Sequence, residues 1–496
     1  MASSGNGGKA SDLENSTMTQ EGVSRREFLA KAAAGSAALM LSRVPWVLAD
    51  EGKAERPNII FITGDDHNRE DLACTGNPFL HTPAFDSLAR DGTRFDRAFT
   101  ITAVCTPSRT CFHTGLYPHT SGSYGFVPMK RGVRIISEYL KEAGYQTGCI
   151  GKLHLMPDKS RTFDTYVADK DLDTGRDIAG FAREMRKFLA AGTKDKPFYL
   201  ELGFCDPHRP FPTPGVKKGR AKEVPNPHDP AKVQVPPYLA DVPPVRKELA
   251  QYYDAIHRLD RGIAMVLDVL EKSGRADNTL VMYAGDHGRA FPFSKTTLYD
   301  MGLNVPFLAR WPGKLPAGAT SDAMIHFVDI LPTFLELAGV VVPKHVQGKS
   351  FADVLRGRTK KHRDVVFGSH TTHFYATSVP SRSIRDDRYH YIFNLTSNEF
   401  CSNSLSGISY QAMAAHAKKD PELAARLHRL KYRSQEELFD VRADRFEMKN
   451  LATSPAHAAV RNRMNRRLTM FMKEISDPWL PVLLQQNGAL GLGGKA

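Results

Sequence analysis

The chain is 496 residues long, with 41% hydrophobic and 24% charged residues, which is an ordinary globular composition. This length is enough for a large core and favours two domains, or one large and one small domain. The formal net charge of +13 predicts attraction to anions. Because the basic residues form no blocks interleaved with aromatic side chains, nucleic acid is excluded as the expected partner.

The first 50 residues have the composition of an export signal. Two adjacent arginines within SRREFLAK, at 24–31, precede a short and weakly apolar stretch that ends near Ala49. This pattern resembles a twin-arginine signal, so we expect residues 1–50 to direct export to the periplasm or the extracellular space. No later stretch is long and apolar enough for a membrane helix, and stable membrane insertion is therefore not expected.

After residue 55, short apolar runs alternate with amphipathic segments. This alternation predicts an α/β fold with a central, mostly parallel sheet between helices. Strands are predicted at 58–63, 145–150, 197–204 and 279–284. Helices are predicted at 82–92, 134–145 and 248–272. Eleven of the 31 prolines lie between residues 206 and 245, which predicts a long loop there.

The pattern changes at about residue 365. From there short runs alternate between polar and apolar residues, and a final helix is predicted at 457–475. We expect a large α/β domain over 55–365 and a smaller α+β domain with an antiparallel sheet over 366–482. Residues 483–496 are expected to form a flexible tail.

Carboxylates follow two of the predicted strands. Asp65 and Asp66 come after the first strand, and Asp286 and His287 come after the fourth. Ligands of open α/β sheets bind outside the carboxyl ends of the strands, so these side chains should converge. Adjacent carboxylates repel each other unless a cation lies between them. Three carboxylates and one imidazole suit a divalent ion, Ca²⁺ with Mg²⁺ as the alternative.

Cationic and imidazole side chains follow the other two strands. Lys152 and His154 come after the second strand, and His208 comes after the third. Lys295 lies in an aromatic loop beyond Asp286. We therefore expect these four side chains to bring positive charge and acid/base groups to the same site.

Cys105 lies where a helix is predicted to begin. Pro107 is favoured in the first turn of a helix, where free backbone amides and the helix dipole attract an anion. Arg109 adds a planar set of donors that suits an oxyanion. The segment therefore predicts a site for a tetrahedral anion beside a nucleophile and the metal. The six cysteines lack CxxC spacing, so neither a zinc site nor a disulfide framework is predicted.

The segment CTPSR at 105–109, followed by Thr114 and Gly115, resembles the signature C-x-P-S-R-x4-T-G of the sulfatase family. The other strand ends and the C-terminal segment EELFDVRADRFEMKNLA stand in the order of that family, and the resemblance extends from Arg56 to about Leu480. It implies an alkaline phosphatase-like fold and an enzyme that hydrolyses sulfate from sulfated glycans.

The same resemblance implies a modified nucleophile and a metal. Cys105 would be oxidised to formylglycine by a formylglycine-generating or an anaerobic maturation enzyme, and the aldehyde would act as its hydrate. The calcium ligands would be Asp65, Asp66, Asp286 and His287.

Roles for the remaining residues also follow from the resemblance. Arg109 and Lys152 would hold the aldehyde hydrate and the sulfate, and His154 would act as a base. His208 and Lys295 would bind a sulfate oxygen and protonate the leaving oxygen or nitrogen.

Within the family the chain is most similar to the N-sulfoglucosamine sulfohydrolases, through the segments DPHRPF, GRAFPFSKTTLYDMG, VVFGSHTTHF and ISDPWL. This implies an N-sulfated glucosamine as substrate, with His370, His373 and Arg382 as candidates for a wall that recognises it. Phe374 stands where an acidic residue is expected, so an O-sulfate ester of another polysaccharide stays open. A phosphate or phosphonate monoester hydrolase of the same superfamily and a sulfated-glycan binding protein are further alternatives. An oligomer is left open.

Overall fold

The computed structural model describes residues 56–193, 195–373, 378–396 and 405–490. Residues 55–496 form one compact unit. The expected signal peptide falls in the other unit, residues 1–54, which lies outside the described residues. Within the described ranges, every helix is too short or too polar to cross a bilayer.

The large sheet has the strand order β4-β3-β5-β1-β6-β7-β2-β8, and β9 pairs with β2. The strands are β1 (Asn58–Gly64), β2 (Thr93–Phe99), β3 (Gln146–Gly151), β4 (Thr165–Ala168), β5 (Phe198–Gly203), β6 (Thr279–Gly285), β7 (Asn304–Arg310), β8 (Ala319–Ser321) and β9 (Ile325–His326). From β4 to β6 all neighbours are parallel, whereas β7 runs antiparallel to both β6 and β2. This confirms the mostly parallel sheet predicted from the sequence.

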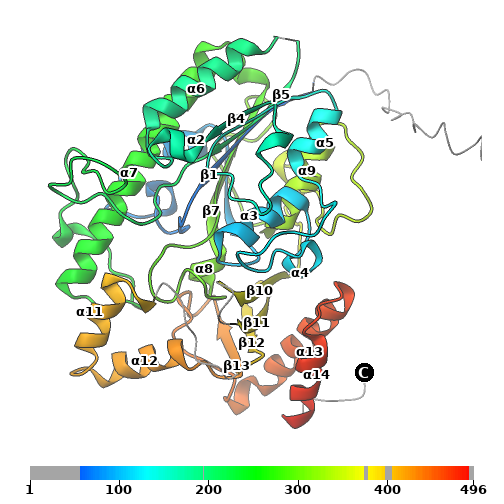
Figure 1. Ribbon diagram of the computed structural model, residues 1–496. Coiled ribbons are helices and arrows are strands. Elements are labelled where there is room, and N and C mark those ends of the chain that lie inside the picture. Colours follow the sequence, from blue (N-terminus) through cyan, green and yellow to red (C-terminus); the bar gives the residue numbers. More distant parts are fainter. Residues whose placement is uncertain (1–55, 194, 374–377, 397–404, 491–496) are drawn as a thin grey trace, which may run out of the picture. The chain divides into compact units, whose positions relative to one another are not determined.

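Helices cover both faces of the large sheet (Figure 1). One face carries α2 (Pro83–Arg90), α6 (Ile178–Ala191) and α7 (Pro243–Lys272), and the other carries α3 (Cys105–Thr114), α5 (Ile136–Glu142) and α9 (Ile330–Leu337). Strand β1 explains this layering, because Ile60 and Ile62 pack with the first group and Ile59 and Phe61 with the second. A strand that is buried on both faces has a nearly continuous apolar run, here Ile59 to Ile62.

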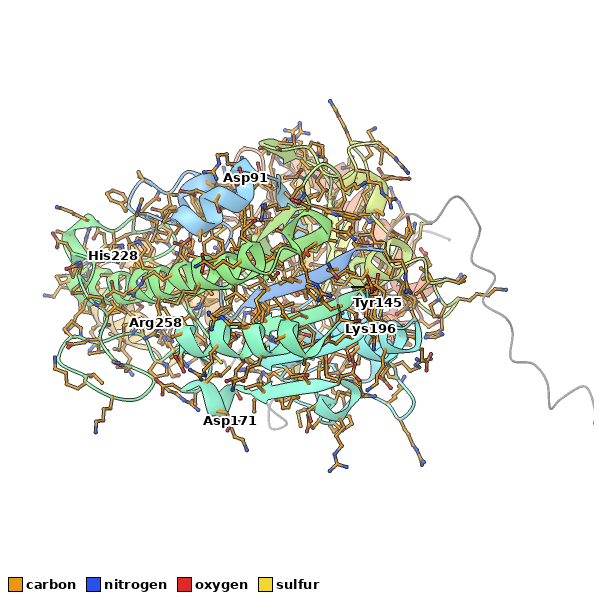
Figure 2. All side chains as sticks on the ribbon, turned by 90° about the horizontal axis from the view of Figure 1, so that it is seen from above. Asp91, Tyr145, Asp171, Lys196, His228 and Arg258 are labelled. Atoms are coloured by element: carbon orange, nitrogen blue, oxygen red, sulfur yellow. The ribbon has the colours of Figure 1, made fainter. Side chains whose placement is uncertain are left out.

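Helix α7 begins earlier than the residue 248 predicted from the sequence. Its first turn contains Pro243 and Pro244. The first residues of a helix need no N–H partner, so prolines start a helix there although they would break its interior. The proline-rich loop therefore ends at Val242. Figure 2, viewed from above, shows α7 and α6 lying side by side over the sheet.

A second sheet is antiparallel, in the order β10-β11-β12-β13. Its strands are β10 (Val366–Thr372), β11 (Ser378–Arg385), β12 (Tyr389–Asn394) and β13 (Glu436–Asp440). The remaining helices are α4 (Pro118–Ser121), α8 (Asp300–Leu303), α10 (Ala352–Leu355), α11 (Ile408–His416), α12 (Pro421–Lys431), α13 (Ala458–Glu474) and α14 (Leu480–Ala489). The antiparallel sheet predicted after residue 365 is confirmed.

The flexible tail expected from residue 483 is wrong for the residues up to 489, because these belong to α14. Leu483 is fully buried in the main hydrophobic core. Asn487 exchanges two hydrogen bonds of 2.9 Å with Asn465 on α13. These contacts hold the helix against the protein, and they join side chains of two helices whose pairing the sequence pattern does not indicate. Residues 491–496 lie outside the described residues.

Candidate active site

The ends of β1, β3, β5 and β6 lie in register at one edge of the large sheet. Gly64 pairs with Gly285, and Gly203 pairs with both Thr63 and Gly151. The loops that leave these strands therefore start next to one another. The four polar strand ends predicted from the sequence therefore lie close together. The ends of β1 and β6 are in direct contact, because the backbone N–H of Asp66 donates to Asp286 Oδ1 at 3.1 Å.

Three carboxylates and an imidazole gather at this edge. Ligand atoms of Asp65, Asp286, His287 and Cys105 all lie within 4.8 Å of one another, and His287 Nε2 is 3.5 Å from Asp66 Oδ1. Burial and the neighbouring Asp65 raise the pKa of Asp286. Asp66 Oδ2 is buried and accepts no hydrogen bond from the described part of the chain. A crowded set of buried oxygens with one oxygen unused fits a divalent cation.

Two lysines flank the carboxylates. Lys152 Nζ donates to Asp65 Oδ2, and Lys295 Nζ lies 2.6 Å from Asp66 Oδ1. Burial alone would lower the pKa of each ammonium group, but Asp65 raises that of Lys152 and Asp66 raises that of Lys295. Both side chains therefore stay charged, and they bring positive charge to the site where an anionic substrate would bind.

Cys105 is the first residue of α3 and is only 1% exposed. Its Sγ lies 3.2 Å from His287 Nε2, 3.4 Å from Asp65 Oδ1 and 3.8 Å from Lys295 Nζ. One turn on, Ser108 Oγ donates to the carbonyl of Asp286 at 2.6 Å and fixes the start of α3 against the end of β6. The residue at position 105 therefore lies between the carboxylate cluster and the two lysines.

Arg109 connects several strand ends and is fully buried. Its Nε donates to Asp286 Oδ2 at 3.0 Å, and its Nη1 donates to Thr63 Oγ1 at 3.2 Å and to the carbonyl of Lys152 at 2.9 Å. Its Nη2 is buried without a partner. The sequence suggested an anion-binding arginine, but most of its donors hold the protein together, and only Nη2 remains for a ligand.

His154 and His208 are both neutral near pH 7. Burial, assisted by Lys152, lowers the pKa of His154 to about 2, and its buried Nδ1 has no hydrogen-bond partner. Burial lowers the pKa of His208 to about 4 against the opposing effect of Asp66. His208 Nδ1 contacts the carbonyl of Arg209 at 2.5 Å, so this nitrogen carries the proton, and Nε2 lies 3.8 Å from Asp66 Oδ2.

The expected substrate wall is only partly formed. His373 lies beside the site, because Lys295 and His287 contribute to lowering its pKa to about 4, after burial. His370 is buried within β10 opposite Ser381, where burial and Arg433 lower its pKa. Arg382 corrects the expectation, since it is 1% exposed and its Nε donates to Asp477 Oδ2 at 2.6 Å. It stabilises the packing of β11 against the α13–α14 junction and presents no surface to a substrate. Phe374 lies outside the described residues.

The variant Arg382→Gln is therefore expected to lose stability, not substrate affinity. Breaking a buried ion pair leaves Asp477 uncompensated and costs about 3–5 kcal/mol of unfolding free energy. Thermal unfolding and KM are measured together. The exposed pair of Arg358 and Asp353 gives the control Arg358→Gln, with no measurable loss of Tm expected. If Arg382→Gln raised KM and left Tm unchanged, Arg382 would bind the substrate as the sequence suggested.

Sequence reasoning missed two features of the site. The ring of Phe126 lies between the rings of His154, at 5.4 Å, and His373, at 5.2 Å. Asp206 accepts from Arg258 on α7 at 2.6 Å, and this ion pair holds the loop after β5. Phe126 stands in no motif that could have indicated it. Asp206 follows a strand as the site residues do, and its distant partner could not be found from the sequence.

A cavity of about 280 Å³ opens onto these residues. On the inner side it is lined by Asp65, Lys152, His154 and His208, and on the outer side by Tyr166 and Arg220. This volume is near the lower end of the range for small-molecule sites.

The chain matches the family model described as Sulfatase over residues 57–340, and the model described as N-sulphoglucosamine sulphohydrolase, C-terminal, over residues 285–402. An ulvan-active sulfatase from Formosa agariphila is 33% identical over 432 residues, which cover 86% of this chain and 81% of that protein. The N-sulphoglucosamine sulphohydrolase of Homo sapiens is 30% identical over 473 residues, 86% of this chain and 92% of the human protein. A protein solved in complex with its substrate D-glucosamine-2-N,6-O-disulfate has a similar fold, with a TM-score of 0.66 and 22% identity over 85% of this chain and 99% of that chain.

Proposed function

The chain belongs to the sulfatase family and is a sulfatase, and from that premise we propose that it removes the N-sulfate group from glucosamine residues of a sulfated glycan. The observation that carries this proposal is the match of residues 285–402 to the C-terminal model of the N-sulphoglucosamine sulphohydrolases. That segment contains Lys295 and His373, which lie at the site. The human relative supports the same substrate.

We propose that the mature residue at position 105 is formylglycine, made from Cys105 by a maturation enzyme. Its hydrate supplies the chemistry, because one hydroxyl can attack sulfur while the leaving amine takes a proton, and the other hydroxyl can then lose a proton and expel sulfate. The surroundings of Cys105 suit this residue, since His287 Nε2 and Lys295 Nζ lie within 4 Å of Sγ.

The neighbouring side chains then orient the reaction. Arg109 Nη2 and Lys152 hold a sulfate oxygen and the hydrate, because both direct positive charge at position 105. Neutral His154 accepts the proton from the second hydroxyl when sulfate leaves. His208 and Lys295 both lie against Asp66. Charged Lys295 holds another sulfate oxygen and delivers the proton to the leaving nitrogen, and His208, whose proton is on Nδ1, would share this task only when Nε2 is protonated as well.

The carboxylate cluster would hold a divalent metal, and we propose Ca²⁺ with Mg²⁺ as the alternative. The ligands are Asp65, Asp66, Asp286 and His287. Bound there, the ion would neutralise sulfate oxygens and polarise the hydrate. Oxygen ligands favour Ca²⁺, which accepts irregular geometry more readily than Mg²⁺ does.

We also propose that the protein is exported. The adjacent Arg25 and Arg26 and the short apolar stretch after them support a twin-arginine route to the periplasm or beyond. In a cell fractionation, the mature protein should then be found outside the cytoplasm and should lack residues 1–50.

The test of the substrate is a panel of sugars that each carry one sulfate, namely glucosamines sulfated at the N-, 3-O- or 6-O-position and a sugar with a 2-hydroxyl group that is sulfated at the 2-O-position. We expect kcat/KM for the N-sulfate to exceed that for each O-sulfate by about tenfold or more, a difference of about 1.4 kcal/mol in transition-state binding. A faster O-sulfate would overturn the N-sulfate proposal and leave the sulfatase class intact. A faster phosphate monoester would favour the phosphate or phosphonate hydrolase.

Mass spectrometry of the peptide that contains Cys105 tests the nucleophile separately. Formylglycine makes this peptide lighter than the thiol form by ~18 Da. Active protein with only the thiol form at this position would contradict the proposed chemistry.

A further inference from the structure

The lining of the cavity as a whole carries more positive than negative charge. Four basic side chains line it, namely Lys152, Arg176, Arg209 and Arg220, against the carboxylates of Asp65 and Asp169. Three of the four basic groups have acidic partners in the protein. Lys152 pairs with Asp65, Arg176 lies 3.4 Å from Asp206, and Arg209 lies 2.7 Å from Glu248.

Arg220 is the exception. It is exposed at the outer rim, and within the described residues no carboxylate lies within 4 Å of its guanidinium nitrogens. The loop around it, residues 213–223, also carries Lys217, Lys218 and Lys222. Only Lys217 has an acidic partner there, Glu223. The rim therefore carries a local excess of positive charge that the protein itself does not neutralise.

Backbone hydrogen bonds hold this loop next to the cavity. Thr213 N donates to the carbonyl of Ala221 at 2.9 Å, and Glu223 N donates to that of Val216 at 2.9 Å. Arg258, labelled in Figure 2, connects the loop to the site, because it binds Asp206 and also donates to the carbonyl of Lys222 at 3.3 Å. Arg258 therefore holds both the loop and the segment after β5 that contains His208.

Two further features of the rim suit a sugar. Tyr166 on the edge strand β4 is 39% exposed and lines the cavity, so its ring offers an apolar face with a hydroxyl at one end. Thr174, which also lines the cavity, has a left-handed backbone conformation with φ of 54°. Strained residues of this kind are retained where a site requires them.

We infer that Arg220, with Lys218 and Lys222, binds a second anionic group of the substrate, a sulfate or carboxylate on the sugar next to the one that loses its sulfate. The catalytic groups occupy the inner side of the cavity and account for one anion. The sugar beyond it would lie on Tyr166 and bring its own charge to the rim. The preferred substrate is therefore an anionic oligosaccharide instead of a single sugar. This inference rests on the proposed function, since it assumes a sulfated glycan.

Steady-state kinetics on four matched substrates test whether Arg220, Lys218 and Lys222 bind a second anion. The substrates are the best monosulfated sugar of the panel and three disaccharides in which the sugar next to it carries a carboxylate, a sulfate or no charge. For Arg220→Gln we expect a KM about three- to fivefold higher for the two charged disaccharides, with kcat unchanged, because an exposed ion pair is lost. The triple variant Lys218→Gln/Arg220→Gln/Lys222→Gln should raise this KM about tenfold or more and make it less dependent on salt. Both variants should leave the single sugar and the neutral disaccharide unaffected.

Arg161→Gln is the matched control. Arg161 is also exposed, but it lies just before β4, at the opposite edge of the sheet from the site. It should behave as wild type on every substrate. Equal KM values for wild type and the triple variant on the charged disaccharides would overturn the inference, and so would a rise that is the same for the neutral one. A wild type that hydrolyses no sulfated sugar would instead overturn the proposed function, and the inference with it. A difference between the carboxylated and the sulfated disaccharide identifies the group that the rim binds.

Discussion

Replacing Cys105 by alanine is expected to lower kcat/KM by at least about 10⁴-fold, because the proposed nucleophile is lost. The carboxylates, lysines and Arg109 around position 105 contact one another directly and stay in place without Sγ. The protein should therefore fold with nearly unchanged Tm. Initial rates of sulfate release and thermal unfolding of the same preparation measure the two effects.

Cys111→Ala is the matched control for this variant. Cys111 is a fully buried cysteine on the same helix α3, and it faces the hydrophobic core. Its removal should cost some stability and leave kcat/KM within about threefold of wild type. If Cys105→Ala kept more than a few per cent of the wild-type rate, the residue at position 105 would not be the nucleophile.

Arg109→Met is expected to damage both stability and activity. The substitution leaves Asp286 buried without its ion-pair partner, which costs about 3–5 kcal/mol of unfolding free energy. It also releases the end of β3, because the carbonyl of Lys152 loses a donor. We expect kcat/KM to fall about 10³-fold in the fraction that folds, from the loss of Nη2 and the displaced Lys152.

Arg109→Lys and Arg382→Gln separate these two effects. Lysine keeps a positive charge but cannot donate to Asp286, Thr63 and the Lys152 carbonyl together, so an intermediate stability and rate are expected. Arg382→Gln breaks another buried arginine–aspartate pair, away from the site, and should reduce stability with kcat/KM unchanged. If both buried-pair variants lost activity in proportion to stability, Arg109 would have only a structural role.

The sheet and its strand ends could be predicted because local patterns determine them. A doubly buried strand is mostly apolar, as at Asn58–Gly64, and parallel strands present their carboxyl ends at one edge. This rule alone is enough to place Asp66 and Asp286 at one site. The start of α7 differs from its predicted position because prolines disfavour a helix interior but not its first turn.

Features that depend on long-range partners could not be predicted. Arg382 follows a segment similar to the family, and only its contact with Asp477, far along the chain, reveals a buried ion pair. Phe126 and Arg258 lie in segments without any signature, yet one contacts two site histidines and the other holds Asp206. The packing of helix α14 likewise depends on a partner in another helix, Asn465 on α13.

Because Cys105 is buried, the proposed oxidation of its thiol can take place only before the protein has folded. At 1% exposure, under Asp65, His287 and Lys295, the thiol is out of reach of any other protein once α3 has packed against the sheet. The proposed maturation enzyme would have to act on the chain before that step, so folding and oxidation would compete for each newly made molecule. A molecule that folded first would keep a thiol and would stay inactive although its fold is complete. The specific activity of a preparation would then report how often oxidation came first, and slower folding would raise it.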